Sequence, residues 1–152
     1  MKNKYDEIKE KHQKIVDTFP MKFAFSDEQF NQSMKELGLK STDTDKVVSI
    51  GGGGFIRKTD VKKYCDMWDK LRKEHNDLIE SDKTGDGYIK DMFVSELENH
   101  EYSYTHELNE TLDALELTRD QIVNNPTLNH GLELAIKEVL RKDLDNTEDY
   151  DL

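Results

Sequence analysis

Residues 59–79, TDVKKYCDMWDKLRKEHNDLI, decide the fold class of this chain. Their apolar and aromatic side chains recur every three or four residues over about five helical turns. Thr59 is suited to the N-cap position, and Asp60 places a negative charge in the first turn. The segment therefore predicts a long amphipathic helix, with Cys65 on its apolar face and in the core.

The same periodicity predicts further helices on both sides of this segment. Two of them begin with a capping box, in which an N-cap hydroxyl and a Gln three residues later bind backbone amides reciprocally. The further helices are expected near residues 5–19, 26–37, 89–99, 105–115, 118–125 and 132–140. Short apolar runs on either side of four glycines predict a β-hairpin around residues 47–57. We therefore predict an α+β fold that is mainly α, with about six helices and one short β-hairpin.

The length and composition fit one folded domain. With 152 residues, six Phe, six Tyr and one Trp, the chain is able to bury a core. We predict a single globular domain over residues 1–142 and a flexible acidic tail over residues 143–152. The single cysteine excludes an internal disulfide, and no apolar run fits a signal peptide or a membrane span, so a cytoplasmic location is expected.

The net charge of −11 is distributed unevenly. Residues 1–90 carry a net charge of +1, residues 91–121 carry −8, residues 122–142 carry +1 and residues 143–152 carry −5. A local acidic field repels nucleic acid and anionic membranes and attracts basic surfaces. We therefore expect a basic partner protein and no direct contact with nucleic acid or membrane.

The glycine run is a candidate anion site. It lies between a predicted strand and a predicted helix, where backbone N–H groups are able to hold a phosphate. The residues concerned are Gly52, Gly53, Arg57 and Lys58. A nucleotide-binding loop of the form G-x-x-x-x-G-K-[ST] is not present, because the sixth position from Gly51 is Ile56. The alternative is a flexible hairpin turn.

Residues 82–93 partly match a calcium-binding EF-hand loop. Asp82, Asp86 and Gly87 fit the pattern, but Phe93 occupies the position of the bidentate glutamate. The same residues also suit a tight connection between two helices. We favour the connection and predict no metal and no cofactor.

The segment 99–107, NHEYSYTHE, concentrates polar and aromatic side chains. His100 and Glu101 are candidates for a general acid/base pair, and a bent loop would be needed to bring His106 to His100. The six-residue spacing of the two histidines does not fit the H-E-x-x-H zinc motif. The alternative is a corner between helices, with hydrogen-bonded His and Tyr side chains.

An acidic row follows this segment at intervals of three residues: Glu107, Glu110, Asp113 and Glu116. On a regular helix these charges would span roughly 13.5 Å, with a spacing comparable to that of the phosphates along one DNA strand. Such a row could imitate nucleic acid and bind a partner together with Tyr102 and Tyr104. The alternative is an ordinary solvated helix face.

Three segments resemble a family of small uncharacterised proteins of phages and bacterial mobile elements. They are FAFSDEQF (23–30), SIGGGGFIRKTD (49–60) and SELENHEYSYT (95–105). The resemblance implies a protein-binding module that occupies a basic surface of a host protein, for example a nucleic-acid-binding defence nuclease such as a CRISPR effector. The alternatives are a small enzyme or ligand-binding protein that uses His100, Glu101 and His106, and a structural or regulatory phage protein.

Overall fold

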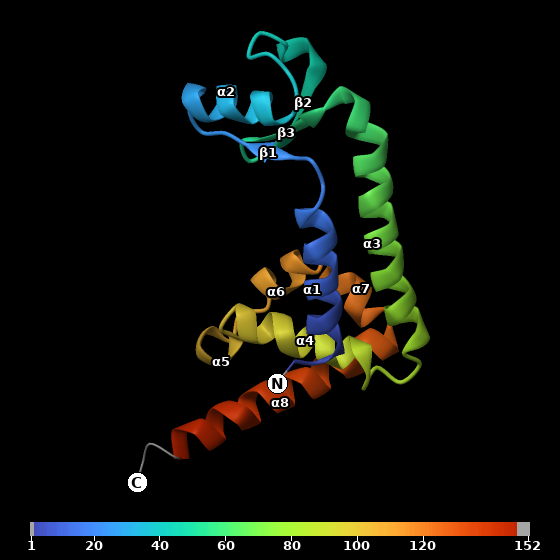
Figure 1. Cartoon of the computed structure of the whole chain (residues 1–152). Coiled ribbons are helices and arrows are strands. Elements are labelled where there is room, and N and C mark those ends of the chain that lie inside the picture. Colours follow the sequence, from blue (N-terminus) through green and yellow to red (C-terminus); the bar gives the residue numbers. More distant parts are fainter. Residues whose placement is uncertain (1, 149–152) are drawn as a thin grey trace. The chain divides into compact units, whose positions relative to one another are not determined.

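A computed structural model describes residues 2–148 of the chain (Figure 1). It confirms a mainly helical α+β fold with eight α-helices and three strands among these residues. In chain order the elements are α1 Lys4–Asp17, β1 Lys22–Phe23, α2 Asp27–Glu36, β2 Val47–Gly51, β3 Gly54–Arg57, α3 Val61–Ser81, α4 Tyr88–Asn99, α5 Tyr102–Thr105, α6 Asn109–Ala114, α7 Arg119–Val123 and α8 Pro126–Glu148.

The described residues form two compact units. The α4 unit comprises those within residues 1–11 and 74–152, and the sheet unit comprises residues 12–73. Both α1 and α3 contribute residues to each unit. The single domain over residues 1–142 stays a prediction. Of the predicted tail, residues 143–148 continue α8 and residues 149–152 lie outside the described part.

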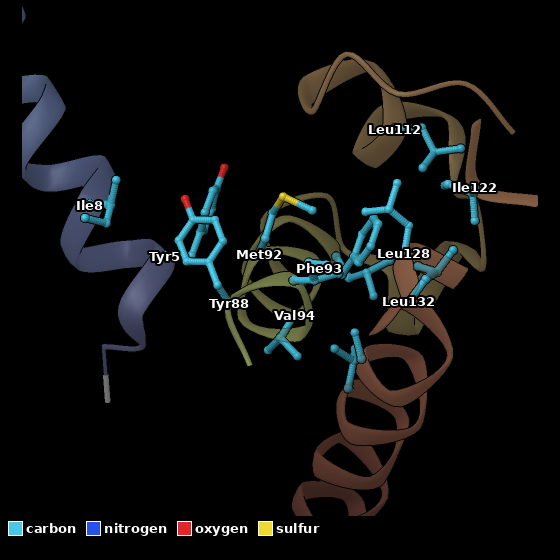
Figure 2. Close-up of a cluster of buried hydrophobic side chains, with 14 residues drawn as sticks. Tyr5, Ile8, Tyr88, Met92, Phe93, Val94, Leu112, Ile122, Leu128 and Leu132 are labelled. Atoms are coloured by element: carbon cyan, nitrogen blue, oxygen red, sulfur yellow. The ribbon is translucent and has the colours of Figure 1, made fainter. Parts of the chain in front are cut away.

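The core of the α4 unit surrounds α4. Eight of the twelve residues of this helix are buried, including Met92, Phe93 and Leu97 with no exposed surface. Figure 2 shows Phe93 directed toward Leu128 and Leu132 of α8, while the rings of Tyr5 and Tyr88 lie together on the side of α1. A helix that is apolar around most of its circumference has to be enclosed by other elements. Here α1, α6, α7 and α8 supply those contacts.

Gly131 allows the backbones of α4 and α8 to approach closely. A Cβ atom at this position would lie 2.5 Å from Ile89 Cγ2 and 2.7 Å from the backbone oxygen of Gly85. Neither distance is compatible with van der Waals radii. The absence of a side chain at this point of α8 is therefore a packing requirement.

The sheet unit contains a three-stranded antiparallel sheet in the order β1-β3-β2. The predicted hairpin is confirmed as β2 and β3, which are joined by glycines with positive φ. The strand β1 adds a third member, with Lys22 opposite Phe55 and Phe23 opposite Gly54. Met34 of α2 and Leu37, which caps the end of this helix, form a small core with Phe55.

Two expectations are wrong. The helix predicted from Thr105 is interrupted, because His106 adopts a left-handed conformation with φ 55° and α6 begins only at Asn109. The Cys65 thiol is exposed rather than part of the core, because the core of α3 contains positions such as Leu71 and the face of Cys65 is turned to solvent.

Candidate functional site

The segment between α4 and α7 folds through three left-handed residues. Glu101, His106 and Glu116 each have φ 55°, and the first two lie immediately before and after α5. For residues other than glycine this conformation costs roughly 1–2 kcal/mol per residue. The acidic segment is therefore a series of short helices with fixed corners.

Five exposed carboxylates lie on this segment, and we name them the acidic face: Glu101, Glu107, Glu110, Asp113 and Glu116. Within residues 2–148, none of them forms an ion pair. Only Glu110 and Asp113 belong to the same helix, α6. The acids predicted to form a partner site are therefore accessible, but they do not form the regular helical row expected from their spacing.

A groove of about 480 Å³ adjoins the acidic face. Leu112 and Leu117 line it together with the carboxylates of Asp113 and Asp120. Arg119 also lines the groove and donates a hydrogen bond from Nη2 to Asn109 Oδ1 at 3.1 Å. Apolar surface and negative charge are therefore adjacent in one hollow, which the sequence pattern did not indicate.

The two tyrosines predicted to contact a partner differ in exposure. Tyr104 is 81% exposed, so its ring is free to contact another molecule. Tyr102 is half-buried against the core, and its ring centroid lies 5.8 Å from that of His106. Of the pair, Tyr104 has the geometry of an accessible contact residue.

The two histidines of the segment lie on either side of α5 in the chain. His100 follows α4, and its Nδ1 lies 2.8 Å from the backbone oxygen of Glu96. The carboxylate that approaches His100 is that of Glu96, at 3.8 Å, whereas Glu101 is exposed. Among the described residues, no group of three His, Cys, Asp or Glu side chains is arranged to hold a metal ion.

Glu96 is the centre of a buried polar network that the sequence reading missed. Its side chain is 3% exposed, and Oε1 accepts hydrogen bonds from Tyr5 Oη at 2.7 Å and from Lys9 Nζ at 2.8 Å. Thr111 Oγ1 donates to the backbone oxygen of the same residue at 3.3 Å. Glu96 lies three and four residues after the buried Phe93 and Met92, so its place on the apolar face of α4 was a usable signal.

Two buried tyrosines predict a loss of stability at alkaline pH. Burial raises the pKa of Tyr5 and of Tyr88 above the ordinary value of 10.0, and Glu96 and Glu74 respectively raise these pKa values further. Above pH 10 the unfolded chain therefore releases phenolic protons that the folded chain retains. The free energy of unfolding should fall by up to about 1.4 kcal/mol per pH unit for each tyrosine.

Urea unfolding between pH 9 and 11.5 measures this slope. Tyr5→Phe and Tyr88→Phe should each remove about half of the tyrosine-dependent part of the slope. A slope that is unchanged in both variants would contradict the prediction.

The glycine turn is exposed, and its two cations differ in their contacts. Gly52 and Gly53 are exposed, with φ 58° and 81°. Arg57 Nε donates to Asp60 Oδ2 at 2.8 Å, and Nη1 donates to the backbone oxygen of Leu37 at 3.3 Å. Lys58 is exposed. The Arg57 guanidinium is therefore already bound within the sheet unit, and Lys58 is the accessible cation of the predicted anion site.

Asp82 closes the turn between α3 and α4. Its carboxylate accepts hydrogen bonds from the backbone N–H groups of Gly85, Gly87 and Ile89 at 2.9–3.1 Å. Burial acts to raise the pKa of Asp82, but these backbone donors together hold it below its ordinary value. The residues that resembled part of a calcium loop are thus organised around a structural carboxylate.

A family model matches residues 4–138, and it describes a family of unknown function. The chain belongs to this family, DUF7659. The DUF7659 match covers α1 to the middle of α8, and therefore includes the acidic face and the Glu96 network. No curated protein and no solved structure matches the chain. Among the described helices, none is long and apolar enough to cross a membrane.

Proposed function

We propose that the chain is a protein-binding module whose acidic face occupies a basic surface of a partner protein. The observation that carries the proposal is the exposure of five carboxylates without ion pairs within residues 2–148. Arg119 is the single cation in residues 91–121 of the sequence. Such a field accelerates association with a basic surface and disfavours acidic competitors.

The strained backbone supports a role for this segment in recognition. Glutamate occupies left-handed positions 101 and 116, where glycine would avoid the steric cost. Strain of this kind concentrates at functional sites, where it fixes the direction of side chains. The left-handed conformation sets the direction in which the side chains of Glu101 and Glu116 leave the backbone.

The neighbouring groove supports a basic partner in particular. A lysine or arginine of the partner would lay its aliphatic stem against Leu117 and bring its charge to Asp113 and Asp120, on the groove that Arg119 also lines. Tyr104 would add an exposed aromatic ring at the rim, and aromatic side chains are enriched at protein interfaces. The face therefore combines charge with apolar contact, as a specific interface requires.

We infer that the partner is a nucleic-acid-binding protein, whose phosphate-binding surface the acidic face covers. The resemblance of three segments to phage and mobile-element proteins supports a host defence protein as this partner. The mimicry depends on charge density and not on a regular helical row, because only Glu110 and Asp113 of the acidic face share a helix.

The experiment compares two variants with the same net charge. The face variant carries Glu107→Gln, Glu110→Gln, Asp113→Asn and Glu116→Asn, the last chosen because asparagine tolerates the left-handed conformation. The control variant neutralises four other acids of the α4 unit that are exposed: Glu7→Gln, Glu80→Gln, Glu133→Gln and Asp145→Asn.

Affinity capture from host lysate, followed by mass spectrometry, should recover a basic nucleic-acid-binding protein with the wild-type chain and with the control variant. The face variant should capture at least about tenfold less, and added salt or nucleic acid should release the partner. Equal capture by the face variant and the control variant would exclude the acidic face as the binding surface.

A further inference from the structure

The backbone of β1 leaves one pair of polar groups directed away from the sheet. Ala24 N–H donates to the Gly53 oxygen at 3.0 Å, so these two residues form a hydrogen-bonded pair of the ladder. Such pairs alternate with non-hydrogen-bonded pairs along an antiparallel ladder. Phe23, which is paired with Gly54, therefore directs its N–H and C=O away from β3 and toward the open edge.

The helix α2 is connected to this edge on both sides of Phe23. The Gln29 side-chain oxygen accepts a hydrogen bond from Phe25 N–H at 2.8 Å, and Lys22 Nζ lies 2.6 Å from Glu36 Oε2. Within residues 2–148, no hydrogen bond across this edge joins Phe23 to another residue. Gln29 thus satisfies one outward-facing backbone group of the edge, and the groups of Phe23 remain available.

A groove of about 780 Å³ lies at this position, lined by Phe23 and by residues of α2 and its N-cap. Its wall on the helix side includes the neutral polar residues Ser26, Gln29, Asn31, Gln32 and Ser33 and the charged residues Glu28 and Lys35. Hydroxyl and amide groups both donate and accept hydrogen bonds. They therefore suit an extended polypeptide, whose backbone presents N–H and C=O groups in alternation.

Two exposed aromatic rings border the same edge. Phe23 is 52% exposed and Phe25 is 77% exposed. Their rings lie over the glycine turn, because a Cβ atom on Gly54 would be 2.7 Å from Phe23 Cε1 and one on Gly53 would be 2.6 Å from Phe25 Cε1. The glycines thereby create room for an apolar surface beside a row of polar groups.

We propose that the groove between β1 and α2 binds an extended peptide segment of a partner protein. The segment pairs with the N–H and C=O of Phe23 and places an apolar side chain on the rings of Phe23 and Phe25. This is recognition by strand addition, in which backbone hydrogen bonds give affinity and alternate side chains give specificity. A second folded copy fits less well. Its own β1 edge is flanked by its α2, so pairing two such edges would bring the two α2 helices against each other.

The test uses a phage-displayed library of random 12-residue peptides, panned on the immobilised full chain. Enriched peptides are synthesised, and their binding is followed through the backbone amide signals in NMR spectra. The signals of residues 22–25 and 26–35 should shift. Binding at this site does not require the acidic face, so the face variant should bind the same peptides with unchanged affinity.

Two substitutions at one position separate the ring from the backbone donor. Phe23→Ala removes the ring and retains the N–H, and should weaken binding about tenfold. Phe23→Pro removes both and should weaken binding by a further factor of about five. Proline is tolerated at an edge where the N–H faces outward. Val123→Ala alters an exposed apolar side chain in the α4 unit and should change nothing.

If Phe23→Pro fails to fold, the double variant Asn31→Ala/Gln32→Ala tests the helix wall and should weaken binding about tenfold. Three outcomes overturn the proposal. The first is a panning in which no peptide is enriched, and the second is that the enriched peptides shift only signals outside residues 22–35. The third is that the signals of residues 22–25 shift with protein concentration in the free chain, which would assign the edge to a second copy.

Discussion

Glu96→Ala is expected to lower the free energy of unfolding by about 2–3 kcal/mol. The substitution removes the acceptor of the Tyr5 hydroxyl, which belongs to a residue that is 6% exposed, and leaves a cavity in a closely packed region. Lys9 contributes less to the cost, because its side chain is 53% exposed and returns to water when its partner is lost. Urea unfolding followed by circular dichroism measures the change.

Three variants separate the parts of this network. Glu96→Gln keeps an acceptor for Tyr5 and should cost only about 1 kcal/mol. Tyr5→Phe removes a donor from a buried carboxylate and should cost about 1.5–3 kcal/mol. The double variant Tyr5→Phe/Glu96→Ala should cost less than the sum of Tyr5→Phe and Glu96→Ala, because it leaves neither buried group unpaired. Strict additivity would show that the two residues do not interact.

Gly131→Ala is expected to destabilise the chain by about 3 kcal/mol, at the upper end of the usual cost of overpacking. In an unconstrained helix the same substitution would be favourable by about 1 kcal/mol, because alanine has the higher helix propensity. Here the new methyl group would lie 2.7 Å from the Gly85 backbone oxygen. A backbone atom cannot relieve this clash by a side-chain rotation, so the backbone itself would have to shift. The helices α4 and α8 would have to separate.

The neighbouring residue supplies the control. His130 is exposed on the same helix, so His130→Ala should be neutral or slightly stabilising. Thermal unfolding of both variants beside the wild type gives the comparison. If Gly131→Ala were as stable as His130→Ala, α4 and α8 would not make the close contact described for Gly131.

The elements that the sequence predicted well are those with a local physical signal. The hydroxyl of Thr118 and the side chain of Gln121 form the reciprocal capping box expected at the start of α7. Gly38 has φ 77° just after α2, a left-handed conformation that suits glycine beyond the end of a helix. Periodicity likewise placed α3 and α4. These features depend on residues within one or two helical turns of each other.

The missed features depend on distant residues or on conformations without a residue signature. Helix propensity does not distinguish a left-handed His106 from a helical one, so the interruption between α5 and α6 was not visible. The strand β1 has two residues, too few for an alternation pattern, and exists through its pairing with β3. The exposure of the acids was foreseeable from their charge. The hydrogen-bond partners of Glu96 were not, because Lys9 and Tyr5 lie 87 and 91 positions away in the sequence.

The α4 unit is discontinuous along the chain, and this determines the order in which the protein can acquire its structure during synthesis. Asn3 donates from Nδ2 to the Asp91 backbone oxygen and to Ser95 Oγ, across 88 and 92 positions. These bonds cannot form until α4 has left the ribosome. Closing so long a loop also costs conformational entropy before the contacts that compensate for it are made. The sheet unit is contiguous over residues 12–73 and has no such delay. Residues 2–11, which leave the ribosome before the sheet unit, are therefore among the last of the described residues to find their partners.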